Sequence, residues 1–158
     1  MTQYVSEHFT WNEVISSQKA ISLGIDNSQP PAEVRTAVNY TASRMEVVKQ
    51  VLHMVSIYVD SWYRCLELNR AVGSKDISQH LRGEAVDFVA PGFGTSLEIA
   101  RELVKQAVTV KFDQLIMEHT WVHISFCSPN DVPRGEVLSS LATGGYALGL
   151  TDKQGNPV

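Results

Sequence analysis

The chain has few cysteines, a small acidic excess and no basic stripe. Its 158 residues include only Cys65 and Cys127, too few for the disulfide framework of a small secreted domain. We therefore expect two buried free thiols. Thirteen Lys and Arg against seventeen Asp and Glu give a net charge of −4. Because nucleic-acid affinity comes mainly from phosphate neutralisation, scattered basic residues argue against a nucleic-acid binder.

Long apolar runs and targeting segments are also missing. The apolar runs extend over only a handful of residues, far short of a bilayer span. The first nine residues, MTQYVSEHF, lack the basic and apolar regions of a signal peptide. We find no internal repeats. We therefore expect one soluble domain over 1–158, without membrane insertion, with a helical lead-in at 1–30 and a tail at 141–158 that is loose.

Helix signals occur at four places along the chain. Thr10 and Glu13 have the spacing of a capping box, which predicts a short helix that ends before residues 24–31. Pro30-Pro31 precedes a long apolar stripe that runs to Leu52 at three- and four-residue intervals. A short helix is expected over 65–72. A second capping box at Thr95-Ser96-Leu97-Glu98 predicts another helix.

Strand signals alternate with these helices. Apolar and polar residues alternate in several short segments, which is typical of half-buried strands. The segments are 55–59, 85–89, 112–117 and 121–126. From Val137 onward the chain is rich in Gly and Ser and allows no firm assignment. The sequence as a whole predicts an α+β fold with a small antiparallel sheet and helices packed on one face.

Two of the predicted strands place polar residues opposite an apolar row. In E-A-V-D-F-V, Val86 and Phe88 point to one side of the strand and Asp87 to the other. In W-V-H-I-S-F, His123 likewise points away from the apolar residues. If the two strands are neighbours, Asp87 and His123 converge on one face, and His80 lies on the loop that leads to Asp87.

Two imidazoles and one carboxylate favour a catalytic zinc ion. Three protein ligands with an open fourth position are the arrangement found in catalytic rather than structural zinc sites. Such a centre activates water and polarises a carbonyl oxygen, as amide hydrolysis requires. On spacing alone, ordinary hydrogen-bonded residues remain the alternative. Nothing places His8, His53 or His119 on the same face, and we do not expect them to be metal ligands.

Three segments resemble the D-alanyl-D-alanine metallopeptidase superfamily, whose fold is related to the hedgehog signalling domain. The run S-Q-H-L-R-G-E-A-V-D-F at 78–88 is similar to its S-x-H-x-x-G-x-A-x-D signature. W-V-H-I-S at 121–125 is similar to its second histidine motif, and S-W-Y-R-C-L-E-L-N at 61–69 to its S-G-Y-R segment. The resemblance extends over roughly residues 30–140 and is closest to the small peptidoglycan peptidases of phages and prophages.

The resemblance implies roles for single residues. His80, Asp87 and His123 correspond to the zinc ligands. Arg64 corresponds to an arginine thought to bind a substrate carboxylate or carbonyl, for which a guanidinium is well suited. Ser78 is expected to hydrogen-bond the substrate or a ligand. Small residues between the ligands, Gly83 and Ala85, would let the backbone turn into the strand without crowding the metal.

Two positions depart from the family pattern. Many relatives have a carboxylate three residues before the last histidine ligand, where this chain has Thr120, which cannot accept a proton. We assign the general base to Glu118, brought over the site by a tight turn at His119-Thr120, with His119 as the second choice. Trp62 replaces the glycine of S-G-Y-R, and we expect its indole to alter the turn or to wall off part of the cleft.

The ligand pattern predicts a zinc hydrolase, and the resemblance implies a monomeric peptidase that cuts stem or cross-bridge peptides of bacterial peptidoglycan. It would act as a phage or prophage endolysin or as a D-alanyl-D-alanine carboxypeptidase. As an endolysin it would collect in the host cytoplasm and reach the cell wall through a separate membrane-permeabilising protein, with no wall-binding domain of its own. The alternatives are a non-catalytic phage structural protein that retains the fold, and a cytoplasmic dipeptidase.

Overall fold

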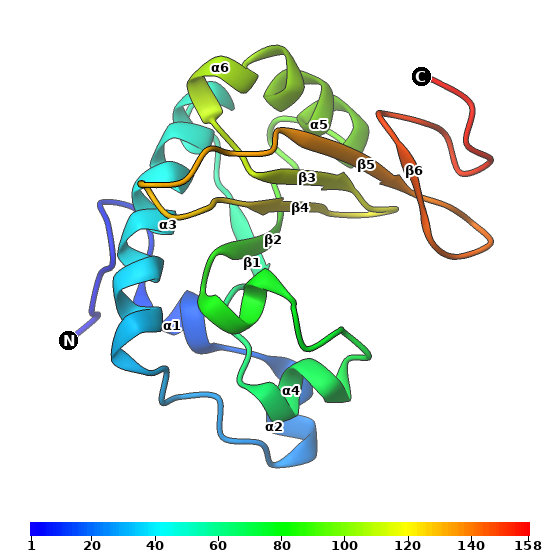
Figure 1. The fold of residues 1–158 in the computed structure, drawn as a ribbon. Coiled ribbons are helices and arrows are strands. Elements are labelled where there is room, and N and C mark those ends of the chain that lie inside the picture. The colour runs from blue at the N-terminus through cyan, green and yellow to red at the C-terminus, as the bar shows by residue number, and fades with distance from the viewer.

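One six-stranded sheet organises the chain. The computed structural model describes all residues from Met1 to Val158 and orders the strands β1-β2-β4-β3-β5-β6 (Figure 1). All neighbouring pairs are antiparallel except β3 and β5, which are parallel. The predicted α+β class is confirmed. The strands are β1 (Tyr58–Ser61), β2 (Ala85–Val89), β3 (Gln114–Met117), β4 (Val122–Ser125), β5 (Glu136–Ser140) and β6 (Tyr146–Leu148).

The helices begin largely where the capping signals predict. Both capping boxes form, at Thr10 with Glu13 and at Thr95 with Glu98. The single helix expected after Thr10 is instead two, because Ser17 caps a second start. The helices are α1 (Trp11–Ile15), α2 (Gln18–Leu23), α3 (Ala32–Val51), α4 (Leu66–Ala71), η1 (Gln79–Arg82, a 3-10 turn), α5 (Ser96–Lys105) and α6 (Ala107–Val110).

The first strand begins later than the alternation predicts. The expected segment is 55–59, whereas β1 begins at Tyr58. The chain leaves α3 through His53 and Met54, whose φ angles of 57° and 63° are left-handed. These residues and the segment up to 57 form the turn out of the helix, so they are not available for pairing.

The two faces of the sheet differ in character. Val86 and Phe88 of β2 and Val122 and Ile124 of β4 are fully buried. They belong to a core cluster that includes residues of α3 and α5, such as Met45 and Leu103. The residues between them point to the opposite face, as the predicted alternation requires. The helices thus cover one face and leave the other to a cavity.

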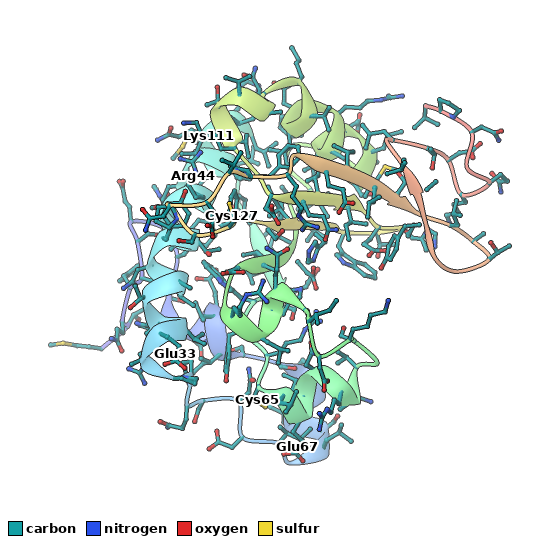
Figure 2. The ribbon with its side chains drawn as sticks, viewed as in Figure 1. Glu33, Arg44, Cys65, Glu67, Lys111 and Cys127 are labelled. Atoms are coloured by element: carbon teal, nitrogen blue, oxygen red, sulfur yellow. The ribbon has the colours of Figure 1, made fainter.

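The remaining features of the fold concern the ends of the sheet and the cysteines. Beyond residue 140 the chain forms β6, which pairs with β5, and an isolated bridge between Thr151 and Pro157. No helix combines the length and the apolar character needed to cross a bilayer. Figure 2 shows Cys65 and Cys127 in separate regions, and both are free thiols as predicted, although each is half-buried rather than buried.

Candidate metal centre

The register of two central strands brings Asp87 and His123 together. β2 and β4 are antiparallel neighbours, and Asp87 lies directly opposite His123. Their alternation points both side chains to the face that the helices leave open. His80 comes from η1, the short turn that precedes β2. The convergence expected from the sequence is therefore found in the structure.

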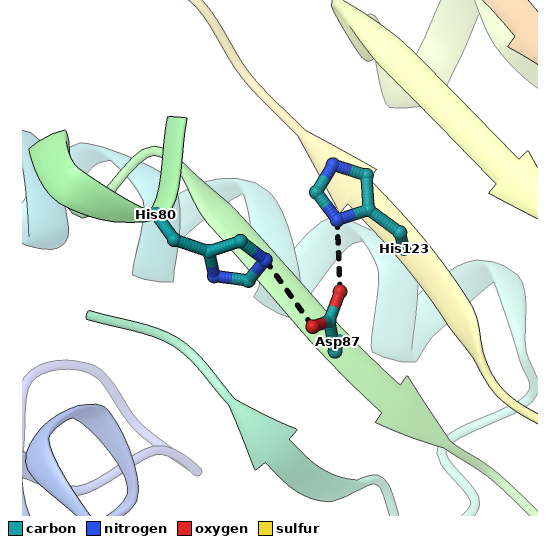
Figure 3. A group of neighbouring side chains, drawn as sticks. All are labelled: His80, Asp87 and His123. Carbon is teal, nitrogen blue, oxygen red and sulfur yellow. Dashed lines mark hydrogen bonds and ion pairs between the residues drawn. The ribbon is translucent and has the colours of Figure 1, made fainter. Parts of the chain in front are cut away.

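The three side chains present one ligand atom each to a common centre (Figure 3). These atoms all lie within 4.8 Å of one another. His80 Nε2 is 3.2 Å from Asp87 Oδ2, and His123 Nδ1 is 2.8 Å from Asp87 Oδ1. Ligands bound about 2.0 Å from a tetrahedral zinc ion stand about 3.3 Å apart, so the two contacts to Asp87 are close to the spacing of such a site. The donor set of two imidazoles and one carboxylate is also one that zinc prefers.

His80 is held in the tautomer that a metal ligand needs. Its Nδ1 donates a hydrogen bond to the backbone carbonyl of Trp62 over 2.6 Å, because a carbonyl oxygen can only accept. The lone pair of the neutral ring is then on Nε2, which faces Asp87. Burial lowers the pKa of His80, and the neutral form is the one that binds a metal.

Asp87 stays ionised although it is buried. Burial alone would raise the pKa of its carboxyl, but the nearby imidazoles of His80 and His123 outweigh this effect and hold the pKa below its usual range. Arg64 adds a bond of 2.7 Å from Nη2 to Asp87 Oδ2. The carboxylate is therefore ready to bind a cation, and three cationic or potentially cationic neighbours already favour its charge.

The Trp62 indole lies in the core and not at the edge of the cleft, where we expected it. Its side chain is fully buried in the core and packs edge-on against Phe9 with ring centroids 6.0 Å apart, so the expectation that it walls off part of the cleft is wrong. The indole Nε1 donates to the carbonyl of Gly83 over 3.0 Å. His80 Nδ1 also donates to the backbone carbonyl of Trp62. Trp62 is thus bonded to both His80 and Gly83 and helps to fix the turn that carries His80.

Gly83 is required for a reason other than room for a metal. Its φ of +71° is left-handed, and a Cβ added there would lie 2.6 Å from Cγ2 of Val38. The nearest atoms belong to Val38 and Val34 of α3 and none belongs to a metal ligand, so the long helix is what requires a small residue here. A small residue at this position lets the turn lie directly on the long helix.

One cavity of about 1160 Å³ opens over the three side chains. It is lined by the three predicted ligands, the two predicted substrate-binding residues and the first choice for the general base: His80, Asp87, His123, Arg64, Ser78 and Glu118. His119 is exposed and does not line this cavity. Because the second choice for the base lies outside the cavity, the geometry favours Glu118.

Arg64 and Ser78 stand on two sides of His80. Three groups of the Arg64 guanidinium are hydrogen-bonded, to Ser61 at 2.8 Å, to Ser74 at 3.2 Å and to Asp87 at 2.7 Å. A guanidinium has five N–H donors, so two stay available for another acceptor. The Ser78 hydroxyl accepts from the backbone N–H of His80 at 3.3 Å and caps η1. In this structure it orients the turn that carries His80.

Glu118 lies at the turn between two site strands. β3 ends at Met117 and β4 begins at Val122, and the N–H of Glu118 donates to the carbonyl of Trp121 over 3.1 Å. The tight turn expected at His119-Thr120 is thus confirmed. A short turn of this kind leaves the Glu118 carboxylate beside the cavity, half-buried, rather than in open solvent.

A polar network in the wall of the cavity was not predicted from the sequence. Buried Asp113 accepts from Gln79 at 3.1 Å and from Nη2 of Arg134 at 2.6 Å. Burial on its own raises the pKa of Asp113, but the bonds from Arg134 outweigh it, so the pKa is lowered. Since Gln79 is the neighbour of His80, this network ties η1 to the loop before β5. No local pattern marks it, because its members come from three distant segments.

The remaining histidines have other partners, as expected. His8 Nδ1 contacts a carboxylate oxygen of Glu46 at 2.8 Å, and His53 stacks on Phe93 with ring centroids 5.8 Å apart. Neither lines the cavity. The ligand cluster therefore uses only two of the five histidines.

Comparison with known proteins identifies the family. No curated protein matches the chain. A model of the Peptidase M15 family, however, matches residues 7–125, a segment that includes His80, Asp87 and His123. M15 peptidases are zinc-dependent, in agreement with the ligand cluster and its donor chemistry. The chain belongs to the Peptidase M15 family of metallopeptidases.

Proposed function

We propose that this protein is a zinc peptidase that hydrolyses peptide bonds in the stem or cross-bridge peptides of bacterial peptidoglycan, as a phage or prophage endolysin or a D-alanyl-D-alanine carboxypeptidase. The observation that carries the proposal is the cavity over the ligand cluster. It brings a ligand cluster of His80, Asp87 and His123 together with the Glu118 carboxylate and the partly free guanidinium of Arg64. These are the groups that metal-assisted amide hydrolysis needs.

The ligand cluster is suited to hold the ion that the family uses. His80 would bind it through Nε2, Asp87 through a carboxylate oxygen and His123 through Nδ1. When bound, zinc supplies a water of lowered pKa and polarises a carbonyl oxygen. The protein supports this by keeping His80 in one tautomer and Asp87 ionised.

Glu118 is the residue we assign to proton transfer. Its carboxylate accepts the proton of the attacking water and returns it to the nitrogen of the leaving amine, so one group is base and then acid. Its carboxylate lies at the turn after β3, and Glu118 lines the same cavity as the ligands, which supports this assignment. His123, five residues later in the chain, lies on the next strand.

Arg64 and the cavity walls are the features that we assign to substrate binding. The two unused N–H groups of Arg64 suit a substrate carboxylate or carbonyl oxygen, which a planar guanidinium binds well. The cavity of about 1160 Å³ exceeds the size of most small-molecule pockets, roughly 300–1000 Å³. It has room for several residues of a peptide, and polar side chains predominate in its lining.

The test uses purified protein loaded with zinc and intact peptidoglycan from several wall types. We expect the protein to release new amino groups and Glu118→Gln to retain zinc while its rate falls by about 100- to 10,000-fold, the usual contribution of a general acid-base group. Glu67→Gln is the matched control, because Glu67 is exposed on α4 and does not line the cavity (Figure 2).

Three outcomes would contradict parts of the proposal. Absence of new amino groups from every wall type would favour a phage structural protein that keeps the fold. Cleavage of free D-alanyl-D-alanine alone would favour a dipeptidase. Full activity of Glu118→Gln would remove Glu118 from the mechanism and leave the metal site in place.

A further inference from the structure

The register of the sheet brings Tyr146 to the end of β3. β5 runs parallel to β3 with Ser139 beside Met117, and β6 runs antiparallel to β5 with Ala147 beside Ser139. Met117, Ser139 and Ala147 therefore lie side by side across the three strands. Glu118 follows Met117 and Tyr146 precedes Ala147, so both lie one position farther along, at the same end of the sheet. The hydroxyl of Ser140, the strand partner of Tyr146, also reaches the carbonyl of Met117 at 3.4 Å.

Tyr146 and Glu118 are in contact at this point. The phenol oxygen lies 3.3 Å from Glu118 Oε1, and both residues line the cavity that contains the ligand cluster. An ionised carboxylate only accepts, so the phenol is the donor. Burial and then the Glu118 carboxylate raise the pKa of Tyr146, which keeps its proton in place. The separation is long for such a bond, as is common for catalytic contacts before substrate binds.

We propose that Tyr146 is a positioning residue that holds the Glu118 carboxylate toward the cavity. This inference rests on the proposed role of Glu118 as the base. Tyr146 lies beyond the segment 7–125 that the family model matches, so that match assigns it nothing. Glu118 has three side-chain torsions and stands on a turn. A donor on a paired strand restricts their freedom, which lowers the entropy lost when the carboxylate meets the attacking water.

The first test is Tyr146→Phe, which removes only the hydroxyl. We expect kcat to fall by about fivefold to tenfold, with KM and zinc content nearly unchanged, because the lost bond concerns the carboxylate and not substrate binding. Leu148→Ala is the matched control: Leu148 lies on the same face of β6 and is 80% exposed, and its removal should leave kcat unchanged. A rise in KM at constant kcat would overturn the proposal.

The second test is a double-mutant cycle with Glu118→Gln. If Tyr146 acts through Glu118, Tyr146→Phe has no further effect on kcat once the carboxylate is gone. An equal loss in both backgrounds would mean that Tyr146 acts on substrate directly, and the proposal would be wrong. If the unmodified protein cleaves no peptidoglycan, the proposed function fails. The contact between Tyr146 and Glu118 is then tested by the measurement below, which needs no activity.

A third measurement does not depend on activity. The pKa of Tyr146 can be followed by NMR of its labelled ring carbon, with zinc at the same level in each sample. Since the Glu118 carboxylate raises this pKa, Glu118→Gln should lower it toward the usual value, and Glu67→Gln should not. The Asp87 carboxylate also raises it and is present in all samples. An unchanged pKa in Glu118→Gln would show that the contact is absent and would overturn the proposal.

Discussion

The two faces of β2 and β4 use neighbouring residues for opposite purposes. On the helix side, Val122 and Ile124 are fully buried among apolar side chains. On the cavity side, Asp87 and His123 are joined to each other by a hydrogen bond. Burial of apolar groups stabilises the fold on one face, and polar contacts prepare a site on the other. Stability and chemistry thus come from alternate residues of the same strands and should be separable by mutation.

The largest effect should come from adjacent residues on opposite faces. His123→Ala removes a ligand, and we expect loss of zinc and of peptidase activity with little change in stability of the metal-free protein. Val122→Ala should retain zinc and lose about 2 kcal/mol of stability, because it leaves a small cavity in the core. Zinc content and urea unfolding with a chelator present measure both quantities.

The assignment of stability to one face and of metal binding to the other would be wrong if either variant showed the effect expected of the other. A metal-free His123→Ala protein that unfolds as readily as Val122→Ala would mean that the cavity face contributes to stability as much as the core. A Val122→Ala protein that loses zinc would mean that the core controls the site geometry directly.

Trp62 belongs to both regions and gives the second prediction. Trp62→Phe keeps an aromatic ring in the core but removes the bond to Gly83, which helps to fix the turn of His80. We expect zinc affinity to fall by about 10- to 100-fold, the usual cost of losing a group that orients a ligand. Competition with a chelator of known affinity measures this.

The control for Trp62 is its neighbour in the core. Phe9 packs against the indole but makes no contact with the turn through a hydrogen bond. Phe9→Leu should cost about 1–2 kcal/mol of stability and leave zinc affinity unchanged. If both variants lose zinc to the same degree, general loosening of the core, and not the indole bond, orients His80.

The smallest effect concerns the pH dependence of stability on the helix side. Glu46 on α3 accepts bonds from Ser6 Oγ at 2.6 Å and from the backbone N–H of His8 at 2.8 Å. Burial raises the pKa of Glu46, but these bonds outweigh it, so its pKa in the folded protein is lowered. The bonds therefore stabilise the fold above the ordinary glutamate pKa of about 4.3, and this contribution is lost as the pH falls through the lower value.

Glu46→Gln should remove this dependence without touching the cavity. We expect the Tm of the unmodified chain to fall more steeply below about pH 5 than that of the variant, while zinc binding at neutral pH stays equal. Thermal unfolding between roughly pH 3 and 7, with chelator in both samples, checks this. Parallel curves would mean that the N-terminal segment does not depend on the Glu46 charge.

Much of the central sheet could be predicted because local patterns determine it. The alternation in β2 and β4 identifies Asp87 and His123, and the capping boxes locate α1 and α5. His80 could be proposed from its place on the loop before β2, whereas Arg64 needed the motif resemblance, since it has no distinguishing periodic position. The motif gave no information about how the Trp62 indole would pack, because its contact with Gly83 joins two segments that only the fold brings together.

The edge of the sheet could not be predicted for a related reason. β5 pairs in parallel with β3 rather than with β4, the strand that precedes it in the chain. Parallel strands are joined by a long connection and not by a tight turn. Neither the loop after β4 nor the glycines near β6 therefore indicate which strand β5 pairs with. Tyr146 acquires its neighbour Glu118 only through this pairing, so no pattern in the sequence could have marked it.

The pairing of Asp87 with His123 also sets which changes in chain length the protein can tolerate. Inserting one residue within β4 before His123 would turn the imidazole toward the helices and a large apolar side chain toward water. Inserting two residues in the hairpin turn at 118–121 would preserve the alternation. Relatives whose chains differ in length between β3 and β4 should therefore carry their extra residues in the turn and not within β4.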